Sequence, residues 1–224
     1  DAEVEIRISA PDYKSAKVSE LPQEGLNELT VSLKPRGRTG VIRGTVSVGG
    51  EPTGGTVILT GPKRYEAQLR DGKFQQKVLV GWYTVSVSKP GMLSAGKDVE
   101  IRSGSRESIS LNLIRRPETS SIELVENRIV VDGSIQFDAD NVANDSLPLL
   151  DQVAAILFEH PEFARVQVGA HMDDSGPESK RKTLTEARAA SVRNYLFKKG
   201  VGANRLEAKG FGSSQPLVPN SSTR

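Results

Sequence analysis

Residues 166–196 read VQVGAHMDDSGPESKRKTLTEARAASVRNYL, and this stretch decides the fold of the C-terminal half of the chain. The alternation of apolar residues at its start predicts a strand over residues 165–170. Its second half carries an apolar helix face with i, i+4 spacing, made of Leu184, Arg188, Val192 and Leu196. A strand followed by a polar loop and a helix is typical of an α/β domain.

Two charged residues in this stretch stand where a folded domain disfavours charge. Asp173 follows the predicted strand, and Arg188 lies on the apolar face of the predicted helix. A buried guanidinium is destabilising unless something pairs with it. Either the two residues form an internal ion pair, or both bind a ligand of opposite charges. Because arginine binds carboxylates and aspartate binds ammonium groups, that ligand would be an amino acid zwitterion.

The surrounding sequence extends the α/β pattern over residues 118–224. Strands are predicted over residues 128–137 and 205–209, and a helix is predicted from Ser146 to His160. Thr183 and Glu186 have the spacing of a capping box at the start of the second helix, and Gly200 is expected to end it. The order βαβαβ predicts a helix-covered sheet with ligands at the carboxyl ends of its strands.

The first half of the chain has a different pattern. Short alternating runs separated by glycine and proline turns predict an antiparallel β-sandwich over residues 37–117. Trp82 and Tyr83 begin one of these strands and are interpreted as core or edge packing, with sugar stacking by Trp82 as the alternative. The fold class is therefore multidomain: all-β sandwich repeats followed by an α/β domain.

An internal repeat links the N-terminus to this predicted sandwich. Residues 4–11 align with residues 83–90 at an offset of 83 − 4 = 79, and residues 29–35 align with residues 109–115. A repeat of this size corresponds to one small sandwich per unit. Residues 1–36 are therefore expected to be the C-terminal half of an earlier sandwich, and the chain is expected to be an excerpt of a longer protein.

Composition removes several classes of function. The net charge is +2 without a dense basic block, so composition offers no argument for nucleic acid binding. The absence of cysteine excludes disulfides, thiolate catalysis and cysteine zinc sites. His171 is interpreted as structural rather than as a metal ligand, and Asp140 as part of a turn at the pocket rim. No nucleophile motif is found, and neither a cofactor nor a metal is expected.

The order His171, Asp173, Leu184, Thr185 and Arg188, with its spacing, resembles the peptidoglycan-binding motif of OmpA-like C-terminal domains. Matches on both sides extend the resemblance over about residues 120–224. It implies that Asp173 binds the ammonium group and Arg188 the carboxylate of diaminopimelate in the cell-wall peptide. It also implies that four neighbours shape the pocket: Met172, Asp174, Leu184 and Thr185. The family's final strand is expected to be missing from the chain.

Residues 38–115 resemble carboxypeptidase-regulatory-like and PEGA-type sandwich domains, on a pattern of alternating strands and glycine turns such as Gly81-x-Tyr83-x-Val85. That resemblance implies a spacer or adhesive module, which could contact outer-membrane or other envelope proteins. Together the two resemblances imply an envelope protein anchored to peptidoglycan on the periplasmic side of a Gram-negative cell, associated with the outer membrane. A cell-wall hydrolase using the same cleft and a protein–protein docking module are the alternatives.

Overall fold

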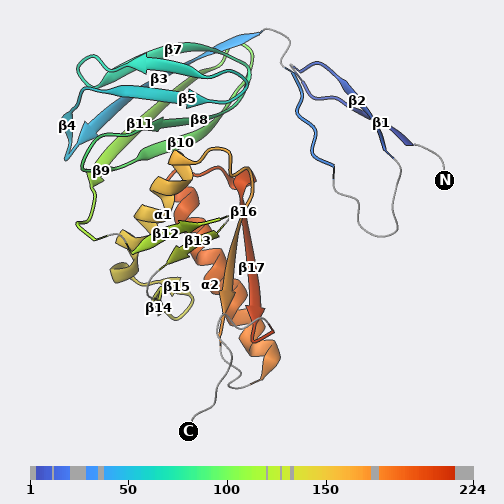
Figure 1. Cartoon of the computed structure of the whole chain (residues 1–224), viewed down its shortest axis with the longest axis vertical. Helices are drawn as coiled ribbons and strands as arrows, with labels where there is room; N and C mark the ends of the chain where they lie inside the picture. The colour runs from blue at the N-terminus through green and yellow to red at the C-terminus, as the bar shows by residue number, and fades with distance from the viewer. Residues whose placement is uncertain are drawn as a thin grey trace.

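A computed structural model describes residues 4–11, 13–20, 29–34, 38–119, 121–126, 128–131, 134–172 and 177–214. Three parts follow one another along the chain: an N-terminal hairpin, a domain of two β-sheets, and a C-terminal domain with two long helices (Figure 1). We call the second and third parts the two-sheet domain and the C-terminal domain. Within the described residues, no helix is both long and apolar enough to cross a membrane.

The N-terminal hairpin pairs β1 (Val4–Ile8) with β2 (Ala16–Glu20) in antiparallel register, from Val4 opposite Glu20 to Ile8 opposite Ala16. The same register recurs between β8 (Gly81–Val87) and β10 (Ala95–Ile101), where Tyr83 lies opposite Val99. The offsets agree on both strands, since 83 − 4 = 79 and 99 − 20 = 79. This agreement supports the expected repeat, whereas the assignment of residues 1–36 to an earlier sandwich stays a prediction.

The two-sheet domain consists of strands that order as β10-β8-β5-β6 in one sheet and β4-β3-β11-β9 in the other, with β7 paired to β3. The remaining strands are β3 (Thr39–Val48), β4 (Glu51–Pro52), β5 (Thr56–Thr60), β6 (Tyr65–Gln68), β7 (Lys73–Leu79), β9 (Met92–Leu93) and β11 (Arg106–Arg115). The expectation of purely antiparallel pairing is wrong for β3 and β11, which run parallel. These are the first and last long strands of the domain, so no tight hairpin forces them to be antiparallel.

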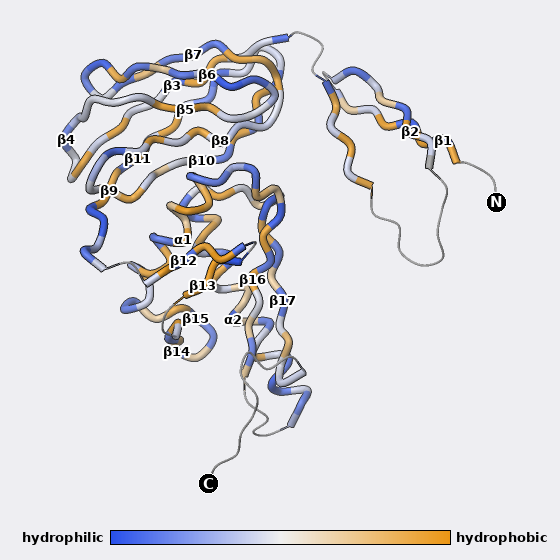
Figure 2. The backbone as a smooth tube through the Cα atoms, in the orientation of Figure 1, coloured by the Kyte–Doolittle hydropathy of each residue, from blue (hydrophilic) through white to orange (hydrophobic). Residues whose placement is uncertain are grey.

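The core of the two-sheet domain lies between the sheets. Alternate residues of β3, β5, β8 and β11 turn inward, among them Ile42, Leu59, Val85 and Leu111. Figure 2 shows the matching alternation of apolar and polar residues along these strands. The predicted strands are thus observed, because a period of two places every second side chain in the core. The resemblance to carboxypeptidase-regulatory-like domains stays a prediction.

The C-terminal domain begins with two small hairpins and continues with alternating helices and strands. The hairpins are β12 (Ile122–Val125) with β13 (Arg128–Val131), and β14 (Phe137–Asp138) with β15 (Asn141–Val142). A short 3₁₀ turn (Asn144–Ser146) leads into α1 (Leu147–Glu159), followed by β16 (Val166–His171), α2 (Glu178–Lys198), a second turn (Ala203–Arg205) and β17 (Leu206–Gly212). One apolar core joins α1, α2 and the first hairpin through Leu150, Leu196 and Ile122.

The predicted order βαβαβ is therefore observed, but the single sheet is not. Among the described residues β16 pairs in parallel with β17, whereas β13 pairs with β12. The strand predicted over residues 128–137 is interrupted: β13 ends at Val131 and β14 begins only at Phe137. β13 and β14 each pair with a neighbouring strand in a hairpin, and the pattern of apolar runs alone does not predict this pairing.

The second helix also starts earlier than its capping box predicts. The N-cap of α2 is Pro177, and Thr183 lies in the second turn, where its Oγ1 donates to the carbonyl of Ser179 at 3.0 Å. Proline favours a helix start, and residues 178–182 contain good helix formers, so helix formation needs no later cap. The predicted end is confirmed: Gly200 follows the helix with φ +107°, a conformation that favours glycine.

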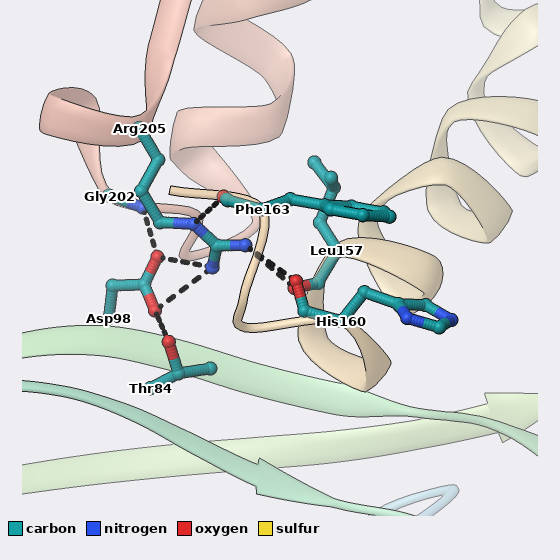
Figure 3. Close-up of polar contacts among 7 residues, drawn as sticks. All are labelled: Thr84, Asp98, Leu157, His160, Phe163, Gly202 and Arg205. Atoms are coloured by element: carbon teal, nitrogen blue, oxygen red, sulfur yellow. Dashed lines mark hydrogen bonds and ion pairs between the residues drawn. The ribbon is translucent and has the colours of Figure 1, made fainter. Parts of the chain in front are cut away.

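A buried ion pair joins the two-sheet domain to the C-terminal domain (Figure 3). Asp98 of β10 accepts hydrogen bonds from Arg205 Nη1 at 3.1 Å, Gly202 N at 2.7 Å and Thr84 Oγ1 at 2.5 Å. The Arg205 guanidinium also donates to the carbonyl oxygens of Leu157, His160 and Phe163. Both side chains are almost fully buried, so the contact forms a dry polar joint between the domains.

Candidate functional site

The carboxyl ends of β16 and β17 lie side by side because the two strands are parallel. The pairing shifts at Ala170 and His171, and one further hydrogen bond, from Met172 N to Gly212 O at 3.0 Å, continues it beyond β16. The start of α2 packs against the same end of β17. In α/β proteins ligands bind at this edge of a parallel sheet, which identifies the region to search for a site.

Thr185 fixes the beginning of α2 to the end of β17. Its side chain is fully buried, and its hydroxyl accepts a hydrogen bond from Gly212 N at 3.0 Å. The same hydroxyl can donate to the carbonyls of Arg181 or Lys182, at 2.9 and 3.0 Å. A Cβ atom added at Gly210 would collide with the backbone of α2, so helix and strand are in direct contact. Thr185 therefore holds the start of α2 and the end of β17 in place next to the site.

Arg188 lies one helical turn beyond Thr185 and is half-buried. Its guanidinium carbon sits 5.0 Å from the ring centroid of Phe137, in cation–π geometry. Its Nε is buried and has no hydrogen-bond partner among the described residues. An aromatic ring thus covers one face of the guanidinium, while its buried Nε–H is left without an acceptor among the described residues.

Leu184 lies in a shallow pocket of about 310 Å³ between the first turns of α2 and the β14–β15 hairpin. Asp140 lies on the other side of this pocket, in the turn of the hairpin. The hairpin is held to α2 by a hydrogen bond from Val142 N to Ser191 Oγ at 3.0 Å. The predicted turn at Asp140 is confirmed, and its place at the rim of the ligand pocket stays a prediction.

The two histidines lie on different elements and make different contacts. His171 stacks on Phe211, with ring centroids 4.7 Å apart and the planes at 1°. His160, at the end of α1, lies 2.8 Å from a carboxylate oxygen of Glu162, and this hydrogen bond lowers the pKa of the Glu162 carboxyl. Across the part of the chain that the structure describes, no group of three or more histidine, aspartate or glutamate residues is placed to hold a metal.

The structure thus brings four of the predicted site residues to one end of the domain: Met172, Leu184, Thr185 and Arg188. Asp173 and Asp174 lie outside the described residues. Phe137 and Gly212 were not predicted from the sequence to belong to the site, although both contact this group. The available signals were Phe137 at the end of an alternating run and Gly212 after Gly210-Phe211.

Comparison with protein families identifies the C-terminal part of the chain. Residues 136–224 match the OmpA family. These residues form an OmpA-like domain. It contains α1, α2, β16 and β17, and therefore the whole of the group around Arg188. The hairpin β12–β13 precedes the matched range, although Ile122 shares the core of the domain.

Known relatives are similar to part of the chain. Outer membrane protein A of Bordetella avium is 32% identical over 105 residues, which are 47% of this chain and 52% of that protein. The peptidoglycan-associated lipoprotein of Rhizobium meliloti is 30% identical over 86 residues, 38% of this chain and 48% of that protein. The chain thus spans about half the length of these relatives. The crystal structure of the peptidoglycan-associated lipoprotein from Burkholderia pseudomallei aligns with a TM-score of 0.35 and 28% identity, covering 39% of this chain and 74% of that one.

Proposed function

We propose that the OmpA-like domain binds peptidoglycan noncovalently and so anchors an envelope protein to the cell wall. The class of ligand is transferred from relatives such as the peptidoglycan-associated lipoprotein of Rhizobium meliloti. Binding of this kind needs no cofactor and makes no covalent bond. The chain accordingly acts as an anchor and not as an enzyme.

The observation that carries the proposal is the buried Nε of Arg188, which has no hydrogen-bond partner among the described residues. A half-buried arginine whose Nε has no partner among the described residues is unfavourable, unless a ligand completes its hydrogen bonds. A carboxylate is the natural ligand, because it accepts two parallel N–H bonds from the guanidinium edge. Phe137 covers one face of the guanidinium and thereby orients that edge. Arg188 therefore binds the carboxylate of the ligand.

Asp173 supplies the opposite charge in this proposal. It follows β16 in the sequence, close to Met172, whose backbone is held at the end of β17. An amino acid centre offers an ammonium group and a carboxylate a few ångströms apart, and the pair would bind both. Diaminopimelate in the stem peptide carries such a centre. Leu184, Met172 and Asp174 shape the pocket around it, and Thr185 holds the backbone on which the pocket is built.

The cellular setting follows from the same assignment. The chain acts on the periplasmic side of a Gram-negative envelope, associated with the outer membrane, as the name of the outer membrane protein A relative suggests. The two-sheet domain serves as a spacer and can contact outer-membrane or other envelope proteins. Its buried joint to the OmpA-like domain supports this role, because a fixed spacer holds the anchor at a set orientation.

A sacculus pulldown tests the proposal. Purified sacculi are incubated with wild type, Asp173→Ala, Arg188→Ala and Lys198→Ala, the last being an exposed positive residue at the far end of α2. We expect wild type and Lys198→Ala to pellet with the sacculi and the other two variants to remain in solution. If Asp173→Ala and Arg188→Ala pellet as wild type does, the proposal is wrong. Release of soluble muropeptides from the sacculi would favour a hydrolase instead.

A further inference from the structure

A groove of about 740 Å³ runs between the two-sheet domain and the OmpA-like domain. Its floor is the outer face of β5 and β8, and its wall is the end of α1 with the loop at residues 161–164. The Asp98–Arg205 joint shown in Figure 3 closes one side. A groove of this size, built at a domain boundary, has the dimensions and the location of a ligand site.

Trp82 lines this groove and is 46% exposed. It is next to Tyr83, which is 1% exposed and points into the core, so the alternation of β8 directs the indole to the outer face. Trp82 is also the single tryptophan of the chain. An aromatic side chain exposed within a groove is typical of a binding site, because ligand sites are lined largely by apolar and aromatic side chains.

Four neutral polar side chains of this groove are available for hydrogen bonds with a ligand. Thr60, Ser86, Ser88 and Asn204 line the same groove, and none of their side chains makes a hydrogen bond with another described residue. Together they offer hydroxyl and amide groups that can both donate and accept. The groove therefore combines an aromatic surface with hydrogen-bonding capacity and leaves both open to a ligand.

The charged groups of the groove already make contacts within the protein. Arg205 binds Asp98 at its base, and Arg64 lies 3.4 Å from Glu66 at its rim. On the helix side, Glu159 accepts from Arg116 at 3.1 Å and from Ser94 at 2.6 Å, and Glu162 is hydrogen-bonded to His160. A strongly charged ligand would have to compete with these pairs. The groove is consequently suited to a neutral ligand rich in hydroxyl and amide groups.

We propose that this groove binds a neutral saccharide chain, namely the N-acetylated hexosamine glycan strand of peptidoglycan. The C–H groups on one face of a pyranose ring carry partial positive charge and pack on the negative face of an indole. Its hydroxyl and acetamido groups match the serine, threonine and asparagine side chains of the groove. The choice of this glycan rests on the proposed function, because it is the part of the same polymer that the Arg188 site does not contact.

The two sites lie at opposite ends of β17. Arg205 at the joint precedes the strand, and Gly212 near the Arg188 site ends it. A strand of seven residues spans roughly 20 Å. One molecule can therefore contact a stem peptide at one end of the OmpA-like domain and a glycan strand at the other.

Tryptophan fluorescence tests the groove directly, since its only source is Trp82. The full chain is titrated with chitotetraose, a soluble chain of four N-acetylglucosamine units that carries no peptide. We expect a saturable blue shift of the emission, and the same curve for Arg188→Ala, which leaves the groove intact. By calorimetry, Trp82→Phe should retain binding and Trp82→Ala should lose at least tenfold in affinity. Folding of Trp82→Ala is checked by circular dichroism.

The outcomes separate this inference from the proposed function. No saturable change up to the solubility limit of chitotetraose, or an equal response to maltotetraose, would overturn the glycan groove. If the groove fails while sacculus binding still depends on Arg188, the proposed function stands alone. If chitotetraose binds while Arg188→Ala pellets as wild type does, the glycan site stands and the assignment of Arg188 falls.

Discussion

Two arginines of the OmpA-like domain, Arg205 and Arg188, differ in how their guanidinium groups are satisfied. Arg205 is 6% exposed, and each of its guanidinium nitrogens donates to a protein oxygen, on Asp98 or on the carbonyls at the end of α1 and in the following loop. Arg188 is half-buried, and its guanidinium lies over the ring of Phe137. Its buried Nε lacks a partner among the described residues.

This difference indicates what each residue is for. A buried charge whose hydrogen bonds are completed inside the protein stabilises one arrangement of the chain, here the joint between two domains. A charged group whose hydrogen bonds are not completed inside the protein contributes little to folding, but its free donor can bind a ligand. Stability and binding should therefore separate when the two arginines are changed one at a time.

The largest effect is expected for Arg205→Ala. The substitution removes the positive partner of the buried Asp98 carboxylate and the donor to three carbonyl groups near the joint. Breaking a buried pair in this way costs about 3–5 kcal/mol, to be measured as the free energy of unfolding in urea. Arg165→Ala is the control, since Arg165 is exposed and its change should cost no more than about 0.5 kcal/mol. An equal loss of unfolding free energy in both variants would contradict the claim that the buried Asp98–Arg205 pair stabilises the protein.

A smaller loss is expected for Thr185→Val. Valine has nearly the same shape but leaves the N–H of Gly212 without its acceptor. An unsatisfied buried donor costs about 1–3 kcal/mol, and hydrogen exchange at Gly212 should accelerate. Thr183→Val removes a hydroxyl from the exposed side of the same helix and should change the free energy of unfolding by no more than about 0.5 kcal/mol. A stable Thr185→Val with slow exchange at Gly212 would exclude this positioning role.

A weaker coupling is expected between Phe137 and Arg188. A double-mutant cycle with Phe137→Leu and Arg188→Met isolates the cation–π contact from the loss of packing. We expect a coupling of about 0.5–1 kcal/mol in the free energy of unfolding, because the guanidinium is only half-buried. Additive effects of the two substitutions would show that Phe137 does not orient the guanidinium.

Much of this fold follows from local patterns in the sequence. The alternation at Val166 and Val168 predicts β16, and the i, i+4 stripe through Val192 and Leu196 predicts α2, because each element buries one face. The pairing between strands is harder to predict from the sequence. The parallel pair of β3 and β11 and the local pairing of β13 depend on contacts across the tertiary structure. The capping box at Thr183 was misleading because Pro177 starts the helix earlier.

In the candidate site, too, some residues could be predicted from the sequence and others could not. Arg188 is unusual on sequence grounds alone, because a charged residue interrupts the apolar face of a helix. The grouping of Leu184, Thr185 and Met172 was expected from the resemblance to the OmpA-like motif, and the structure brings the three residues to one end of the domain. Phe137 and the joint at Asp98 could not be found, since each partner lies some 50 residues or more away in the chain. Such contacts are set by packing, which leaves no local signature.

The central claim is that Arg188 is a ligand group and not a structural one. Its most direct test is the free energy of unfolding of wild type and Arg188→Ala, with and without meso-diaminopimelate. Without ligand, we predict a difference below about 1 kcal/mol. With ligand at a hundred times its Kd, wild type should gain about 2.7 kcal/mol and the variant should gain nothing. A variant that loses about 3 kcal/mol or more without ligand, together with a wild type that diaminopimelate does not stabilise, would show that Arg188 is structural and contradict this account.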